Sequence, residues 1–192
     1  MISLTVPTTR DDRSLVIEMA ADYVEEYLHE HGTLPPSPLL TLDTLPLIIR
    51  RNGRPVGVMS MATGDAEDGS ERSEIDTVYL MPRYRGRGYA SAAVIEFAVF
   101  APHHPYLRGP LDDVMAHIAQ ELEIPTGDHH DLCSLGMVTT AFLNTVNCTH
   151  TRMIQKRHED DPCRNCVHTE ARKHFTKTYD LLAERIEGVS AP

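Results

Sequence analysis

Residues 74–90 read EIDTVYLMPRYRGRGYA and contain four local structural signals in succession. Residues 74–81 are rich in β-prone side chains and predict a strand. Pro82 ends this strand because proline cannot donate a hydrogen bond to a neighbouring strand. Gly86 and Gly88 predict a tight turn, and an apolar helix begins at about residue 88. The chain is therefore expected to pass directly from a strand through a glycine turn into a helix.

Such a turn is suited to binding an anion. Glycines let backbone N–H groups point into one concavity, and they remove side chains that would keep a ligand away. The following helix adds its unpaired N-terminal N–H groups and the positive end of its dipole. Arg85 and Arg87 place positive charge beside the turn. A pyrophosphate group suits this arrangement, and a purely structural turn is the alternative.

Two other phosphate-binding motifs are excluded, since the turn has no Gly-Lys-Ser/Thr and lacks the third glycine of a dinucleotide fingerprint. The segment instead resembles motif A of the GNAT superfamily, where a strand ending in Val-x-Val/Leu-x-Pro precedes (Gln/Arg)-x-x-Gly-x-(Gly/Ala). The matching residues are Val78, Leu80, Pro82, Arg85, Gly88 and Ala90. A second register, starting at Arg83, also fits the shorter pattern. The first register places Pro82 and Tyr84 where the family has them.

The order of elements before the motif also resembles the family. Residues 2–6 predict a strand, and residues 11–28 predict a helix that Asp11 or Asp12 could cap. Two further β-prone runs, 45–50 and 55–61, are joined through Asn52-Gly53, a strong hairpin signal. The resemblance therefore covers roughly residues 1–101.

The second half of the chain differs in character, and a Pro- and His-rich stretch at 102–105 indicates a boundary. Helices are expected near 111–123, 131–147 and 168–187, and strand signals are weak. In the last helix one apolar stripe is formed by Ala171, Phe175, Leu182 and Ile186. We therefore expect an α/β fold with a GNAT-like mixed, mostly antiparallel sheet flanked by helices. Residues 1–101 would bind acyl-CoA, and residues 102–192 would form an atypical helical C-terminal region.

The resemblance implies acetyl-CoA as the acyl donor. The strand segment formed by Val78, Tyr79 and Leu80 would lie along the pantetheine arm, with Val78 and Leu80 supplying main-chain hydrogen bonds. The backbone amides of the turn would bind the pyrophosphate. The residues implied for this second role are Arg85, Gly86, Arg87, Gly88, Tyr89 and Ala90.

The reaction requires that the acceptor amine lose a proton and that the leaving thiolate gain one. Glu74 lies where many family members carry the general base, and Asp76 has the same strand parity and is the reserve candidate. Solvated carboxylates at a strand edge are the alternative. The family tyrosine that acts as general acid has no match, because Phe175 stands in its place. Tyr179, one turn later, could substitute or could be a packed aromatic residue.

Cysteine and histidine residues gather in two short segments of the C-terminal half. Three thiolates and one imidazole can complete the tetrahedral coordination of a structural zinc ion. The predicted ligands are Cys148, Cys163 and Cys166 with His150 or His168. Reduced thiols without a metal and a redox-active Cys-x-x-Cys are the alternatives. Cys133 lies in an apolar helical segment, where we expect it to pack in the core.

The composition is that of a globular protein, and its net charge is −10. This acidity argues against nucleic-acid binding and favours a cationic substrate. No apolar run is long enough to span a membrane, and the N-terminus does not resemble a secretory signal, so a cytoplasmic location is expected. The oligomeric state is left open.

Three functions remain in contention. The first is an N-acetyltransferase that acts by direct transfer on a primary amine, in a small molecule, a protein lysine or an N-terminus. The second is an acyl-CoA-binding module without catalysis. The third is a zinc-stabilised helical interaction domain on a GNAT scaffold. We expect the first.

Overall fold

The computed structural model describes residues 1–36, 39–66, 68–109, 111–128, 142, 144–146, 148 and 163–189. Its strands are β1 (Ile2–Thr5), β2 (Leu45–Arg51), β3 (Arg54–Asp65), β4 (Glu71–Leu80), β5 (His104–Gly109) and β6 (Thr126–Asp128). Its helices are α1 (Arg10–His31), α2 (Tyr89–Phe100), α3 (Asp113–Glu121) and α5 (Arg164–Val189), and a 3-10 turn, η1, spans Pro82–Tyr84.

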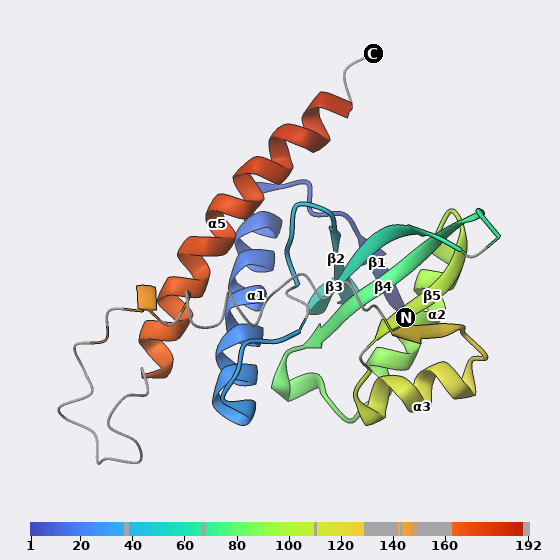
Figure 1. The fold of residues 1–192 in the computed structure, drawn as a ribbon, viewed down its shortest axis with the longest axis horizontal. Coiled ribbons are helices and arrows are strands. Elements are labelled where there is room, and N and C mark those ends of the chain that lie inside the picture. Colours follow the sequence, from blue (N-terminus) through green and yellow to red (C-terminus); the bar gives the residue numbers. More distant parts are fainter. Residues whose placement is uncertain are drawn as a thin grey trace.

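The described strands form one sheet in the order β1-β2-β3-β4-β5-β6 (Figure 1). The pairs β1–β2, β2–β3 and β3–β4 are antiparallel, whereas β5 is parallel to both β4 and β6. The β2–β3 hairpin turns at Asn52 and Gly53, which both have positive φ, as their sequence predicts. The expected α/β fold, with a mixed and mostly antiparallel sheet flanked by helices, is confirmed.

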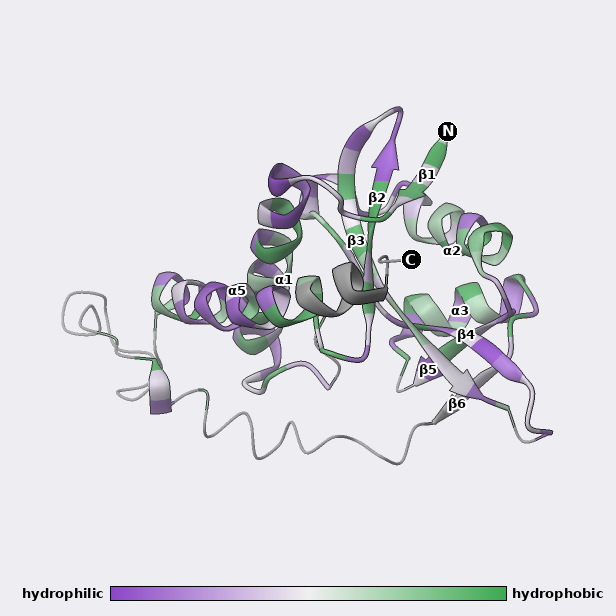
Figure 2. Ribbon diagram, turned by 90° about the horizontal axis from the view of Figure 1, so that it is seen from above, coloured by the Kyte–Doolittle hydropathy of each residue, from purple (hydrophilic) through white to green (hydrophobic). Residues whose placement is uncertain are grey.

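Helices cover both faces of the sheet (Figure 2). On one face, α1 and α5 pack together over Ile48, Val58 and Tyr79. On the other face, α2 and α3 pack over Leu47, Ile49 and Met59. Adjacent strand residues thus enter opposite cores, as the alternation of side chains along a strand requires.

Residues after 101 contribute two strands to this sheet, which the sequence did not indicate. The prolines and histidines of 102–105 suggested a boundary, but β5 begins at His104 and pairs with β4. Only Leu107 of β5 is fully buried, so the strand has no alternating apolar pattern. The division of the chain at residue 101 stays a prediction, although the region beyond it is not purely helical.

The predicted helices agree with the structure except in local detail. Thr9, not Asp11 or Asp12, caps α1, because its hydroxyl accepts a hydrogen bond from the N–H of Asp12 at 3.1 Å. Both aspartates lie in the first turn, where their negative charges interact favourably with the positive end of the helix dipole. The helix predicted at 131–147, with Cys133, falls largely outside the described residues. No described helix is long and apolar enough to span a membrane.

The apolar stripe predicted in the last helix packs against α1, except that the side chain of Ile186 lies outside the described part of the chain. Ala171, Phe175, Tyr179 and Leu182 of α5 are all buried in the core that α1 shares with the sheet. Figure 1 shows the two helices side by side. The C-terminal helix is therefore part of the same hydrophobic core as the N-terminal half.

We predict that Phe175→Ala lowers the free energy of unfolding by about 3–5 kcal/mol, because it empties a site in which the side chain is only 3% exposed. The matched control is Leu181→Ala, at a position on the same helix that is 52% exposed, where we expect a change within about 0.5 kcal/mol. Urea denaturation of the full chain measures both. Equal effects of the two substitutions would show that α5 is not docked as described.

Candidate active site

Strands β4 and β5 pair over a short distance and then part. Their ladder runs from Arg72 opposite His104 to Ile75 opposite Leu107. From Leu107 onward β5 pairs with β6 on its other edge. In the described sheet, the residues Val78–Leu80 have a ladder with β3 alone. The end of β4 that leads into the glycine turn is therefore an edge at which a ligand could add main-chain hydrogen bonds.

A β-bulge lies at the same point of β4. Ser60 and Met61 of β3 stand opposite Thr77 and Ile75, so three consecutive residues of β4 face two of β3. A bulge bends its strand and increases the local twist. Asp76 is the middle residue of this bulge, and it lies where β4 turns away from β5.

The glycine turn has the backbone conformation that the sequence predicts. Gly86 and Gly88 have φ values of 68° and 71°, a region that favours glycine. An added Cβ at either position would meet no atom within 4 Å, so the side of the turn is open. Gly88 is the N-cap of α2, and no described side chain caps this helix. The first N–H groups of α2 have no partner within the helix, so this turn could bind an anion.

Arg85 braces the turn instead of pointing freely toward a ligand. Its N–H donates to the carbonyl of Pro82, and its Nε donates to the carbonyl of Leu80 at 2.9 Å. The guanidinium also forms an ion pair with Glu26 of α1 and lies 5.4 Å from the centroid of the Tyr79 ring. Arg87 is also exposed and adds a second positive charge at the turn.

Tyr79 points to α1, so its side chain is directed away from the open edge of β4. Its hydroxyl donates to Oε1 of Glu26 at 3.3 Å, and its ring is 5.8 Å from that of Tyr23. Burial, with the Glu26 carboxylate nearby, raises the pKa of Tyr79. Burial also raises the pKa of Tyr23, with smaller contributions from Asp112 and Asp76. Both phenols therefore remain protonated hydrogen-bond donors at neutral pH.

The two predicted base candidates, Glu74 and Asp76, share one arginine at the point where β4 and β5 part. Oε1 of Glu74 accepts from Nε of Arg72 at 2.6 Å, and Oε2 lies 3.8 Å from Nε of Arg108. Nη1 of Arg108 is 3.4 Å from Oδ1 of Asp76. Both carboxylates are almost fully buried. The structure brings the two candidates together. Glu74 contacts two guanidinium groups, which favours an ion-pair role for this residue.

The glycine at position 64 is required by this arrangement. A Cβ there would lie 2.2 Å from Oε1 of Glu74, far closer than any van der Waals contact. The buried carboxylate therefore occupies space that a side chain on β3 would otherwise fill.

The structure does not bring Tyr179 to the glycine turn. Its hydroxyl donates to the carbonyl of Pro7 at 3.4 Å, and the guanidinium of Arg13 lies 4.9 Å from its ring centroid. Arg13 is at the start of α1, whereas Glu26, which contacts the turn, is about 20 Å further along the helix. Burial raises the pKa of Tyr179. These contacts favour the packed-aromatic interpretation of this residue.

Two important contacts were missed from the sequence. Glu26 was not singled out, although it shares one face of α1 with Tyr23 and Tyr27 at helical spacing. Arg108 was not singled out either, because the strand that carries it was not predicted. An unpaired buried carboxylate is costly, so the prediction of an inward-facing Glu74 could have prompted a search for a basic partner.

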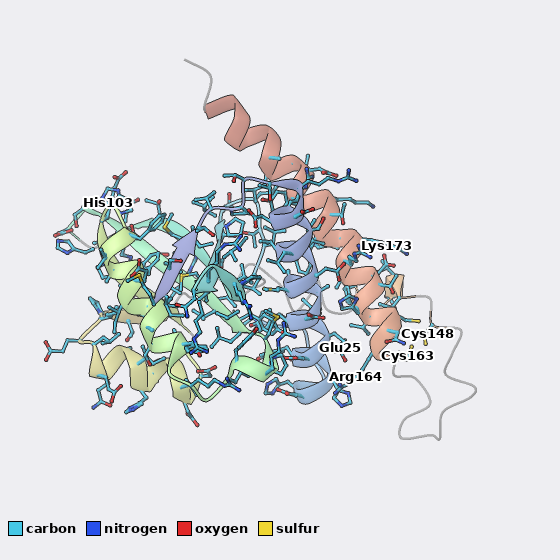
Figure 3. The ribbon with its side chains drawn as sticks, turned by 180° about the vertical axis from the view of Figure 1, so that it is seen from behind. Glu25, His103, Cys148, Cys163, Arg164 and Lys173 are labelled. Carbon is cyan, nitrogen blue, oxygen red and sulfur yellow. The ribbon has the colours of Figure 1, made fainter. Side chains whose placement is uncertain are left out.

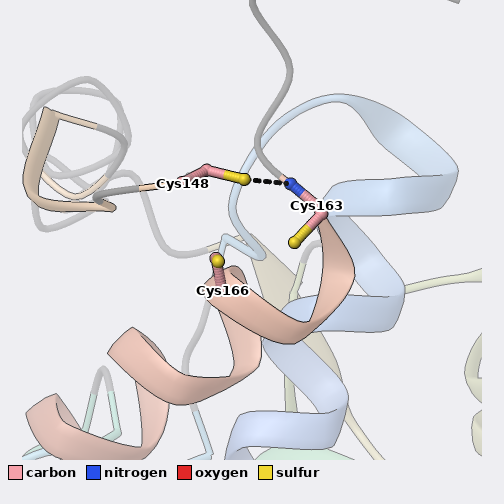
Figure 4. A group of neighbouring side chains, drawn as sticks. All are labelled: Cys148, Cys163 and Cys166. Atoms are coloured by element: carbon pink, nitrogen blue, oxygen red, sulfur yellow. Dashed lines mark hydrogen bonds between the residues drawn. The ribbon is translucent and has the colours of Figure 1, made fainter. Parts of the chain in front are cut away.

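The cysteines of the predicted metal site come together at the start of α5 (Figure 4). The sulfur atoms of Cys148, Cys163 and Cys166 all lie within 4.8 Å of one another. A hydrogen bond with Cys163 raises the pKa of the Cys166 thiol to about 11, and burial makes a smaller contribution in the same direction. His168 is not part of the group, since its Nε2 lies 3.1 Å from Asp22 of α1. His150 lies outside the described residues.

Comparisons with known proteins agree with this geometry. Residues 15–108 match the model of the Acetyltransferase (GNAT) family. None of the curated protein sequences is significantly similar to the chain.

Solved structures of similar fold include a ribosomal-protein-alanine N-acetyltransferase from Brucella melitensis biovar Abortus 2308. It is 18% identical with a TM-score of 0.43, and the match covers 68% of this chain and 95% of that one. A predicted acetyltransferase from Clostridium acetobutylicum, solved with acetyl-CoA, is 14% identical with a TM-score of 0.44, covering 68% and 93%. A possible acetyltransferase from Clostridium difficile 630 is 12% identical with a TM-score of 0.48, covering 68% and 94%.

The family match spans the parted strand, the glycine turn and the helix that follows it. The chain therefore carries a GNAT acetyltransferase domain at residues 15–108.

Proposed function

We propose that the chain is an N-acetyltransferase that moves an acetyl group directly from acetyl-CoA to a primary amine. The amine belongs to a small molecule, a protein lysine or an N-terminus. The observation that carries the proposal is the parting of β4 from β5 immediately before the glycine turn that begins α2. This geometry offers a strand edge and an anion site in line, which is what an acyl-CoA requires.

The donor would bind along this line. The main chain of Val78 and Leu80 would pair with the amides of the pantetheine arm. The amides from Gly86 to Ala90 would bind the pyrophosphate, with Arg87 supplying charge. The Leu80 carbonyl accepts a hydrogen bond from Arg85. The Arg85 side chain would therefore shift, or Leu80 would contribute through its N–H group.

The acceptor would approach where β4 and β5 part. Asp76 lies there, and Asp112 is within electrostatic reach of the same place through Tyr23. Together with the net charge of −10, these carboxylates favour a cationic acceptor. We assign proton removal to Asp76 in preference to Glu74, because both oxygens of Glu74 are directed at arginines.

A second candidate function is an acyl-CoA-binding module without catalysis. The contacts of Tyr179 with Pro7 and Arg13 favour it, since they leave the usual general acid without a counterpart at the site. Tyr23 is the phenol that approaches β4 beside Asp76, but burial raises its pKa, which makes it a poor substitute for the general acid.

We predict that the chain binds acetyl-CoA and that Arg87→Ala weakens the binding about tenfold. A charge-assisted hydrogen bond contributes about 1.5 kcal/mol at the low end of its range, which suits an exposed guanidinium. Isothermal titration calorimetry measures both dissociation constants. Lys177→Ala removes one positive charge from an exposed position on α5 and is the matched control. Absence of acetyl-CoA binding, or equal weakening by both substitutions, would contradict the proposed donor site.

We predict that Asp76→Asn lowers kcat about 10²–10⁴-fold, because the variant cannot accept the proton of the amine. Glu74→Gln should act mainly on stability, because it weakens a buried ion pair with Arg72. Release of free CoA thiol across a panel of amines measures kcat, and thermal unfolding measures stability. If Glu74→Gln abolishes turnover at an unchanged melting temperature, Glu74 is the base and our assignment of Asp76 is wrong. If the wild type binds acetyl-CoA but releases no thiol with any amine of the panel, the chain is an acyl-CoA-binding module without catalysis.

A further inference from the structure

We propose that Cys148, Cys163 and Cys166 bind a zinc ion that fixes the first turn of α5. The three residues come from two segments, one before α5 and one at its start. Their sulfur atoms lie close enough together to bind one ion. This metal site plays no part in the proposed acetyl transfer and is independent of it.

The sulfur positions match the geometry of a zinc site. A Zn–S bond is about 2.3 Å long, so two thiolates of a tetrahedral ion lie about 3.8 Å apart. The three sulfur atoms already lie within 4.8 Å of one another, so small side-chain rotations bring all three to one ion. A disulfide would use only two of them and would leave the third thiol beside the bond. The gathering of three favours a metal.

The backbone at the start of α5 supports the same conclusion. Cys163 immediately precedes the helix, and Cys166 is in its first turn. The N–H groups of Cys166 and Val167 bind the carbonyl of Cys163 at 3.0 and 3.1 Å, which fixes the spacing of the two thiols. The N–H of Cys163 donates to the sulfur of Cys148 at 3.4 Å (Figure 4). This contact holds the Cys148 sulfur at the start of α5, beside the two thiols of the helix.

His168 is excluded as the fourth ligand by its position on α5. Residues two apart on a helix point to nearly opposite sides, so His168 faces away from Cys166. Its Nε2 lies 3.1 Å from Asp22 and 3.6 Å from Glu18, both on α1. The predicted ligand set is thus reduced to the three cysteines, with one tetrahedral position left for a fourth ligand.

The ion would stabilise the docking of α5 on α1. Arg164, next to Cys163, forms a 3.0 Å ion pair with Glu25 of α1 (Figure 3). A metal that orders the first turn of α5 would therefore also order this ion pair. It would further tie the Cys148 segment to the helix, because Cys148 and Cys163 would share one ion.

The test is zinc binding by the full-length protein, purified under reducing conditions and offered one equivalent of zinc chloride. We expect about one zinc per chain by elemental analysis, falling to near zero in Cys148→Ser and Cys166→Ser. His168→Gln is the control and should retain zinc. Cobalt(II) in place of zinc should give the intense absorption of a tetrahedral thiolate site in the wild type and in His168→Gln only.

A second measurement avoids variants that fail to fold. The wild type has four cysteines, and zinc should protect three of them from a thiol-reactive dye in the native state. A chelator should restore their reactivity and lower the melting temperature. The proposal is overturned if zinc protects no thiol, if the cysteine variants bind zinc like the wild type, or if His168→Gln loses the ion. It is also overturned if the zinc-free protein contains a Cys163–Cys166 disulfide that persists when zinc and reductant are supplied.

Discussion

A buried cluster of charged residues lies where β4 and β5 stop pairing, a point that we call the fork of the sheet. The candidate site depends on this cluster. Glu74, Asp76 and Arg108 meet where the ladder between β4 and β5 ends. Buried carboxylates are tolerated only when they are paired, and Arg108 of β5 supplies a partner to both of them. The bulge at Asp76 bends β4 at the same point. The cluster and the bulge together explain why β4 continues toward the glycine turn without β5 beside it.

Helix α1 transmits this geometry to the turn. Glu26 forms an ion pair with Arg85 and accepts a hydrogen bond from Tyr79, so one carboxylate contacts the last part of β4 and the turn together. Gly86 and Gly88 have no side chains to pack, so the residues beside them hold the turn. Arg85 ties it to α1, and Tyr84 and Tyr89 pack against the core on the opposite face of the sheet. The same helix packs against α5 on its other side, which makes the C-terminal region part of the support of the site.

Local signals in the sequence were sufficient for the motif and insufficient for its partners. The strand, the two positive-φ glycines and the apolar stripe around Phe175 were predictable because each is a property of a short segment. Strand β5 was not predictable, since a short parallel strand with one buried apolar residue has no periodic pattern. Because β5 was not predicted, the position of Arg108 and its ion pairs with Glu74 and Asp76 could not be predicted either. The cysteine cluster was predictable from the spacing of its residues, whereas the contacts of His168 with Glu18 and Asp22 of α1 were not.

The aromatic residues of the C-terminal helix are engaged in packing. Phe175 fills the core between α1 and the sheet, and Tyr179, one turn later, donates its hydrogen bond near the start of α1. Phenylalanine has no proton to donate, and Tyr179 lies beside Arg13, about 15 Å along α1 from Tyr23 at the fork of the sheet. Tyr23 borders the fork beside Asp76, but burial raises its pKa, so it is a weaker acid than a free tyrosine and a poor proton donor. In such an arrangement α5 would act on the site only through the position of α1, against which it packs.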